Sequence, residues 1–139
     1  MSTLSKGSFE VQLKPLNPYN DAADAKLASM SIDKQFHGEL EATSKGEMLS
    51  AMGSVTGSAG YVAIERVTGV LHGRRGSFTL QHNATMTRGE PHLNIIVVPD
   101  SGTDALTGLS GKMTIIIADG KHSYEFGYML SPQDKQPTP

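Results

Sequence analysis

The chain has 139 residues, a length that suits one domain with a single hydrophobic core. Its 12 Lys and Arg stand against 14 Asp and Glu without a long run of one sign, which excludes the charge pattern of a nucleic-acid-binding or membrane-surface protein. The absence of cysteine excludes a disulfide framework, a thiolate nucleophile and a thiolate metal site.

The N-terminal segment, residues 1–6, has none of the apolar character of a signal peptide. No later apolar run approaches the roughly 18 residues that a membrane-spanning helix needs. We therefore expect a cytoplasmic protein that neither spans a membrane nor binds nucleic acid.

Apolar residues recur at every second position in several short stretches, which is typical of strands with one buried face. These stretches lie at residues 9–13, 30–36, 61–67, 78–80 and 124–128. The segments 93–98 and 113–118 are instead nearly continuous apolar runs, which predicts strands covered on one face by the core and on the other by a partner chain or loop.

Turn residues separate these stretches. Asp119-Gly120 is the strongest hairpin signal, because both residues tolerate the positive φ of a type I′ turn. Lys45-Gly46, Arg88-Gly89 and residues 72–76 predict further reversals. Only residues 21–29 have a helical composition, which predicts at most one or two helical turns there.

About eight antiparallel strands with scarcely any helix predict an all-β domain over residues 1–130, either a closed barrel or a two-sheet sandwich. The last segment, residues 131–139, contains three prolines and otherwise only polar residues. Such a composition predicts a disordered tail.

The segment 61–86 is predicted to be a hairpin, and a loop at 73–76 places Val67 opposite His82. Glu65 and His82 are then diagonal neighbours on a face that is otherwise apolar, amphipathic or small, and that we expect to be the interior. Burial raises the pKa of a carboxyl group unless a partner stabilises the anion, so the pair is a candidate for proton exchange near neutral pH. The alternative is a buried polar pair that fixes the strand register without catalysis.

The same face predicts the contacts of an interior ligand, which we assign to Tyr61, Phe78, Leu80 and Met86. The five histidines never occur as His-x-His or His-x-x-x-His, so no metal site and no cofactor are predicted. The polar connection at 99–111 is predicted to be either a lid over a barrel mouth or a solvated loop.

Two long motifs resemble a family of small bacterial proteins of unknown function. They are YVAIERVTGVLHGRRGSFTLQH (61–82) and VVPDSGTDALTGLSGK (97–112), preceded by GSFEV (7–11) and HGELEATSKGEML (37–49). The resemblance covers nearly the whole chain apart from the two ends. It implies a fold similar to the allene oxide cyclase barrel, with eight antiparallel strands closed around an interior cavity. Asp100 and Asp104 stand where that family frequently has glycine.

Three hypotheses for function follow. The first is a barrel that binds a mostly apolar small molecule inside. The second is an enzyme, an isomerase or cyclase by the resemblance, in which Glu65 and His82 move protons on that ligand. The third is a non-catalytic structural protein with a filled core. All three predict a homo-oligomer, because Ile96, Val98 and Ile116 would otherwise form an apolar stripe in contact with water.

Overall fold

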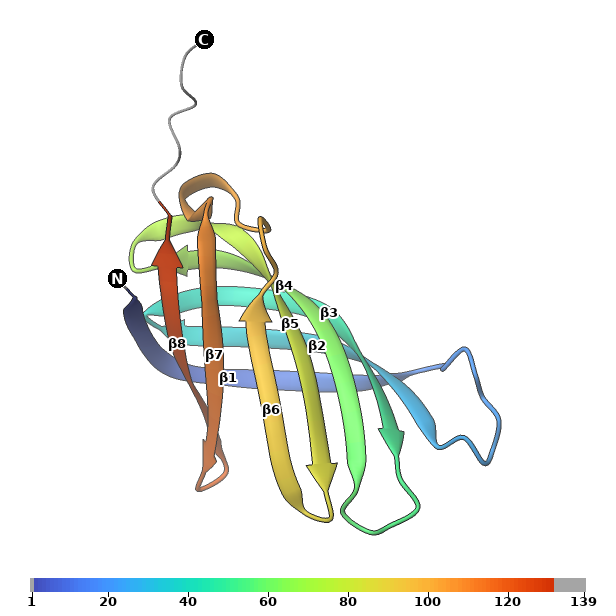
Figure 1. Cartoon of the computed structure of the whole chain (residues 1–139). Helices are drawn as coiled ribbons and strands as arrows, with labels where there is room; N and C mark the ends of the chain where they lie inside the picture. The colour runs from blue at the N-terminus through green and yellow to red at the C-terminus, as the bar shows by residue number, and fades with distance from the viewer. Residues whose placement is uncertain (1, 132–139) are drawn as a thin grey trace.

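The computed structural model describes residues 2–131, and these form a closed antiparallel barrel of eight strands (Figure 1). Each strand pairs with the next along the chain, and the last pairs back with the first. The strands are β1 (Thr3–Leu16), β2 (Leu27–Gly38), β3 (Leu40–Met52), β4 (Ala59–Leu71), β5 (Arg74–Thr87), β6 (Glu90–Val97), β7 (Leu109–Ala118) and β8 (Lys121–Leu130). The closed barrel is therefore confirmed over the two-sheet sandwich. The expected tail lies outside the described residues except for Ser131.

Two hairpins form where the turn residues predict them. Asp119 and Gly120 join β7 to β8 with φ of 53° and 75°. Arg88 and Gly89 join β5 to β6 with φ of 47° and 90°. Positive φ at two consecutive residues gives the backbone twist that a two-residue hairpin needs, which explains why these pairs sit there.

Three local predictions need correction. The β4–β5 turn consists of His72 and Gly73 rather than residues 73–76. Lys45 and Gly46 do not reverse the chain, because they lie inside β3 and pair with β2 and β4. The segment 21–29 contains no helix: a turn with a hydrogen bond from Ala25 N to Ala22 O leads into β2.

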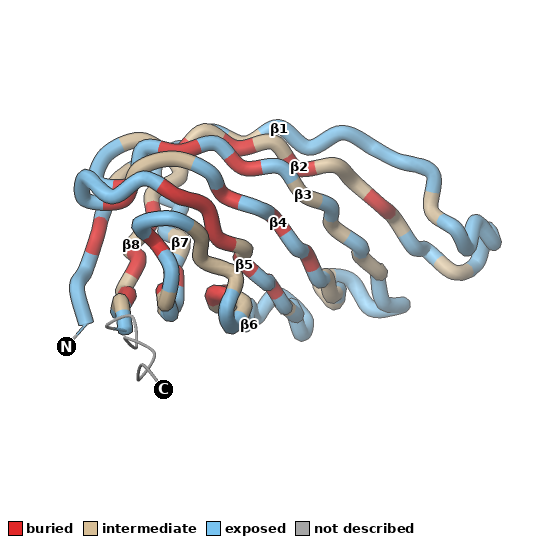
Figure 2. Tube along the Cα trace, turned by 90° about the horizontal axis from the view of Figure 1, so that it is seen from above, coloured by how far each residue is buried: buried red, intermediate tan, exposed pale blue. Residues whose placement is uncertain are grey.

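One half of the barrel is filled by side chains. Its largest buried side chains are Phe36, Leu40, Leu71, Phe78, Leu80, Leu106, Tyr124 and Phe126. The rings of Phe78 and Phe126 are stacked with centroids 5.6 Å apart. Figure 2 shows the buried segments concentrated toward the end that carries β7 and β8, whereas the connection between β1 and β2 is mostly exposed.

The other half is open because β6 and β7 separate early. These two strands share only two register pairs, Ile95 with Met113 and Ile96 with Lys112. Beyond them the strands diverge, so the inward-facing side chains of Leu93 and Ile117 are 39% and 67% exposed. The barrel therefore has a filled end and a mouth, and the mouth lies at the end with the β1–β2, β3–β4, β5–β6 and β7–β8 turns (Figure 1).

The connection between β6 and β7 closes the filled end and is not a lid over the mouth. It contains a 3-10 turn at Asp104–Leu106, and Leu106 is buried in the core. Thr103 N donates to the carbonyl of Ser77, whose own N–H donates to the Thr103 hydroxyl. Asp100 has a φ of 61° and Asp104 one of 52°. Glycine adopts this left-handed conformation more readily than aspartate does.

Candidate functional site

Glu65 is placed in the barrel by the alternation of β4. Its neighbours Ala63 and Val67 are buried with it, whereas Ile64 and Arg66 face outward. The carboxyl group has an exposed fraction of 0%. A carboxylate without water must find its hydrogen bonds within the protein.

Three neighbouring strands supply those bonds. The ammonium group of Lys34 on β2 lies 2.8 Å from Oε2 of Glu65. The hydroxyl of Ser44 on β3 donates to Oε1 over 2.6 Å. Nε2 of His82 on β5 lies 2.5 Å from Oε2. We call Lys34, Ser44, Glu65 and His82 the polar cluster.

The structure brings Glu65 and His82 together as predicted, although in a different register. Ala63 rather than Val67 lies opposite His82, and Glu65 pairs with Leu80. The observed partner of His82 lies four residues along β4 from the predicted one, because the turn between β4 and β5 is shorter than predicted. Because four is an even number, both side chains stay on the interior face and remain diagonal neighbours.

Sequence reasoning missed Lys34 and Ser44. The signal for Lys34 was present, since it occupies the inward position between Ile32 and Phe36 on β2, where the pattern is otherwise apolar. A buried lysine needs a nearby anion, and Glu65 was the carboxyl group already assigned to the interior. Ser44 had no such signal, because a serine on an inward face is common without any partner of this kind.

Gly46 allows the strands to pack beside the cluster. It pairs with Glu65 across β3 and β4. A Cβ atom at this position would lie 2.1 Å from the carbonyl oxygen of Ile64 and 2.6 Å from Cα of Glu65. Only glycine permits this approach, so the residue that looked like a turn signal is a close-packing glycine within a strand.

The polar cluster keeps Glu65 ionised. Burial acts to raise its pKa, but the hydrogen bond from His82 and the charge of Lys34 outweigh burial and lower the pKa from its ordinary 4.5 to about 2. At neutral pH the group is therefore a carboxylate that only accepts hydrogen bonds. This makes Glu65 a weak base and an effective orienting group for the imidazole.

The stability of the barrel is expected to fall in acid for this reason. The difference between 4.5 and about 2 corresponds to about 3 kcal/mol of stability, present above pH 4.5 and lost as the pH falls toward about 2. Urea unfolding at a series of pH values measures it. A Lys34→Met/Glu65→Leu variant is the control, and its stability should fall less between pH 5 and pH 2. An equal loss in both proteins would contradict this origin.

His82 is, with Lys34, one of the two members of the polar cluster that line the open half. Its side chain is 4% exposed, and it lines a cavity of about 180 Å³ at the mouth. Nε2 is engaged by Glu65, whereas the buried Nδ1 has no hydrogen-bond partner among the described residues. A carboxylate that holds one ring nitrogen leaves the other available as an acceptor or base.

The cavity is mostly apolar. It is lined by Phe9, Val11, Leu13, Ile32, Lys34, Met48, Tyr61, Ala63, His82, Leu93, Ile115, Ile117 and His122. Of the predicted ligand contacts, Tyr61 is therefore at the wall, and burial together with the charge of Glu65 raises its pKa. Phe78 and Leu80 lie in the filled core, and Met86 is exposed; none of these three lines the cavity.

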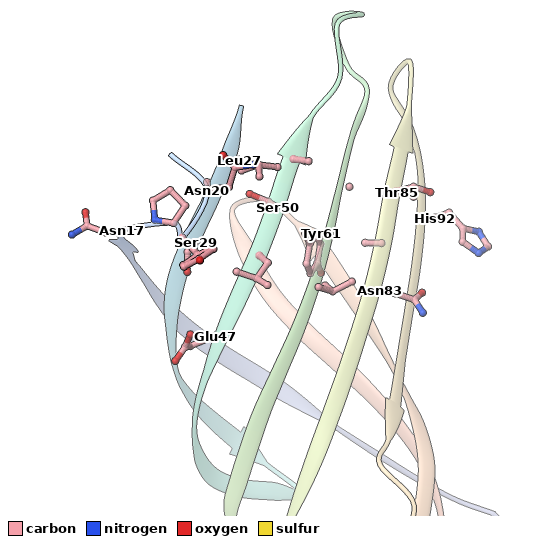
Figure 3. Close-up of a pocket in the computed structure, with 18 residues that line it drawn as sticks. Asn17, Asn20, Leu27, Ser29, Glu47, Ser50, Tyr61, Asn83, Thr85 and His92 are labelled. Atoms are coloured by element: carbon pink, nitrogen blue, oxygen red, sulfur yellow. The ribbon is translucent and has the colours of Figure 1, made fainter. Parts of the chain in front are cut away.

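A larger, open groove of about 880 Å³ lies mainly on the outer face of the sheet (Figure 3). It extends from Asn17 and Asn20 after β1 to Asn83 and His92 on β5 and β6. Its floor includes Leu27, Leu49 and Val62, which are 41%, 56% and 52% exposed. Along each strand, the outward-facing residues of this floor alternate with the residues that line the cavity inside the barrel.

Two further classes of feature are absent from the described part of the chain. Within residues 2–131 there is no helix with the length and apolar character that a membrane crossing requires. The His, Asp and Glu side chains of these residues nowhere gather in a group of three suited to a metal ion.

Together these features define a small closed β-barrel with a filled core at one end, a buried carboxylate–imidazole–ammonium cluster at mid-height and an apolar mouth. The family model "Protein of unknown function (DUF3224)" matches residues 5–128, and the chain belongs to this family. The expected membership in a family of unknown function is thus confirmed, whereas the likeness to allene oxide cyclase remains a prediction.

A solved structure of the same family is similar throughout. It is a protein of unknown function from Shewanella oneidensis MR-1, with 53% sequence identity and a TM-score of 0.90. The match covers 95% of this chain and 99% of the other. The comparison with curated proteins gives no match.

Proposed function

We propose that the chain is a ligand-binding barrel that holds one small, mostly apolar molecule in the cavity at its mouth. The observation that carries this proposal is an apolar cavity of about 180 Å³ with His82 and Lys34 at its wall. Engineered apolar cavities of about 150 Å³ hold benzene, so this cavity suits a molecule the size of a single substituted ring. A few polar groups among apolar walls are the usual composition of a small-molecule site.

Native mass spectrometry of the purified protein, followed by denaturing extraction, tests the proposal. We expect a reproducible bound compound of apolar character. An Ile115→Trp variant should lose it, because that side chain lines the cavity. Ile116→Trp is the matched control, since its side chain faces outward from the same strand and should leave binding intact. Retention of the compound by Ile115→Trp would contradict the assigned site.

A second candidate function is proton-transfer catalysis on the bound molecule. It is favoured by the contact between Glu65 and His82, in which the carboxylate can orient the imidazole and leave Nδ1 as the base. A Glu65→Gln variant should then lose turnover of the extracted compound while its affinity stays largely intact. Undiminished turnover by this variant would contradict a role for the pair in catalysis.

Self-association remains a prediction. Ile116 is 40% exposed, and Ile96 and Val98 are half-buried, so these three outward apolar side chains are not fully covered. Association through an apolar face would remove this surface from water. Light scattering coupled to gel filtration measures the mass, and a clean monomer would contradict the prediction.

A further inference from the structure

The charges of the polar cluster limit the chemistry of the ligand, and this inference rests on the proposed binding function. Lys34 and Glu65 are 6% and 0% exposed and lie 2.8 Å apart, so each compensates the charge of the other. The cluster then has no net charge to offer. A charged ligand entering the cavity would lose its hydration without gaining a counter-ion, which strongly disfavours it.

The hydrogen bonds of the cluster determine the form of His82. Because Glu65 is a carboxylate, it accepts a hydrogen bond from the N–H group at Nε2. The ammonium of Lys34 approaches the same Oε2 atom, so a second positive charge on the imidazole would lie close to the first. With Nε2–H donating to Glu65, Nδ1 of the neutral imidazole is an acceptor.

Nδ1 of His82 is the buried side-chain atom without a hydrogen-bond partner in the part of the chain that the structure describes. An unpaired buried acceptor destabilises the protein, and a donor that pairs with it recovers that loss. Neighbouring wall residues can admit such a donor. Met48 and Tyr61 are half-buried and have rotatable side chains, and the ring centroid of Tyr61 lies 6.3 Å from that of His82.

We propose that the ligand is a neutral, single-ring-sized molecule that carries one hydroxyl or N–H group, and that this group donates a hydrogen bond to Nδ1 of His82. The apolar walls bind the rest of the molecule. The other histidine of the cavity, His122, packs its ring against Phe9 with centroids 5.2 Å apart.

Two probes of nearly equal size, p-cresol and toluene, separate this inference from the proposed function. Titration of the ¹⁵N-labelled protein, followed by NMR, gives both affinities and the residues affected. Toluene is the more hydrophobic, so burial alone would favour it. The inference instead expects p-cresol to bind about tenfold more tightly, because its hydroxyl pairs with a buried acceptor that toluene leaves unpaired.

Variants assign the preference to one nitrogen. His82→Phe keeps a ring of similar size and should abolish the preference for p-cresol, whereas His122→Phe should keep it. The ¹⁵N resonance of Nδ1 in the unsubstituted protein is a second readout that needs no variant: it should be that of an unprotonated ring nitrogen and should shift when p-cresol binds.

Each result has one meaning. Equal or weaker binding of p-cresol relative to toluene would overturn the hydrogen-bond inference and leave an unselective apolar site. A preference that persists in His82→Phe, or a protonated Nδ1 in the free protein, would overturn it as well. Binding of neither probe up to its solubility would contradict the proposed function itself.

Discussion

Replacing Glu65 by alanine is expected to lower the free energy of unfolding by about 3–5 kcal/mol. The substitution removes a carboxylate with an exposed fraction of 0% and leaves the ammonium of Lys34 buried without a counter-ion. Ser44 and His82 also lose their shared acceptor. Chemical denaturation with urea, extrapolated to water, measures the change.

A matched ion pair on the outside of the same sheet provides the control. Lys45 lies 3.1 Å from Asp33 across β2 and β3, but the two side chains are 88% and 43% exposed. Exposed pairs contribute about 0–1 kcal/mol, so Asp33→Ala should change stability by no more than that. Equal effects of Glu65→Ala and Asp33→Ala would contradict the role assigned to the buried pair.

A double variant separates the uncompensated charge from the lost packing. Lys34→Met combined with Glu65→Leu removes both charges and keeps apolar volume in their place. Replacement of a buried ion pair by apolar residues is often neutral or stabilising, so the double variant should be more stable than Glu65→Ala. A double variant as unstable as Glu65→Ala would show that the uncompensated charge of Lys34 does not set the loss, and would assign it to the hydrogen bonds that Ser44 and His82 lose.

Much of the fold follows from the sequence because a strand has a short, exact period. Alternation places Glu65 on the face of Ala63 and Val67, and it places His82 on the face of Phe78 and Leu80. The turn was placed wrongly, yet the resulting shift was even and preserved the face. An odd shift would have placed Glu65 and His82 on opposite faces, so the predicted pair depended on parity more than on turn chemistry.

The predictions that were wrong are those that depend on tertiary contacts. Gly46 looked like a turn residue because glycine has no side chain. Its position requires glycine for another reason, which is the close approach of the β4 backbone. The extent of the cavity depends on where β6 and β7 separate, which local periodicity does not encode. Phe78 and Leu80 therefore belong to the filled core, although their face was assigned correctly.

The position of the polar cluster explains how one buried charge pair can serve both stability and binding. Glu65 pairs with Leu80 of the filled core, whereas His82, two residues further along β5, lines the cavity. Core packing on one side excludes water and strengthens the ionic hydrogen bonds. The same bonds hold the imidazole in one orientation, so Nδ1 keeps a fixed direction beside the cavity, and only the side chains of Met48 and Tyr61 have to move to admit a donor.

Alanine in place of Gly46 is expected to cost more than about 3 kcal/mol of stability and to weaken the polar cluster at the same time. The added Cβ would meet the carbonyl oxygen of Ile64 at 2.1 Å and Cβ of Glu65 at 2.8 Å, so backbone has to move. Because Glu65 is directly opposite, the movement displaces its carboxylate from Lys34 and His82. Urea unfolding gives the stability, and the ¹⁵N resonances of the His82 ring report the loss of the hydrogen bond to Glu65.

Gly127→Ala is the matched control within a strand. Gly127 lies in β8, and a Cβ there would meet nothing within 4 Å, so alanine should leave both stability and the imidazole resonances nearly unchanged. If Gly46→Ala were as well tolerated as Gly127→Ala, β3 and β4 would have to separate easily at Glu65. The cluster would then be a flexible polar patch, and it could not present Nδ1 of His82 in a fixed direction.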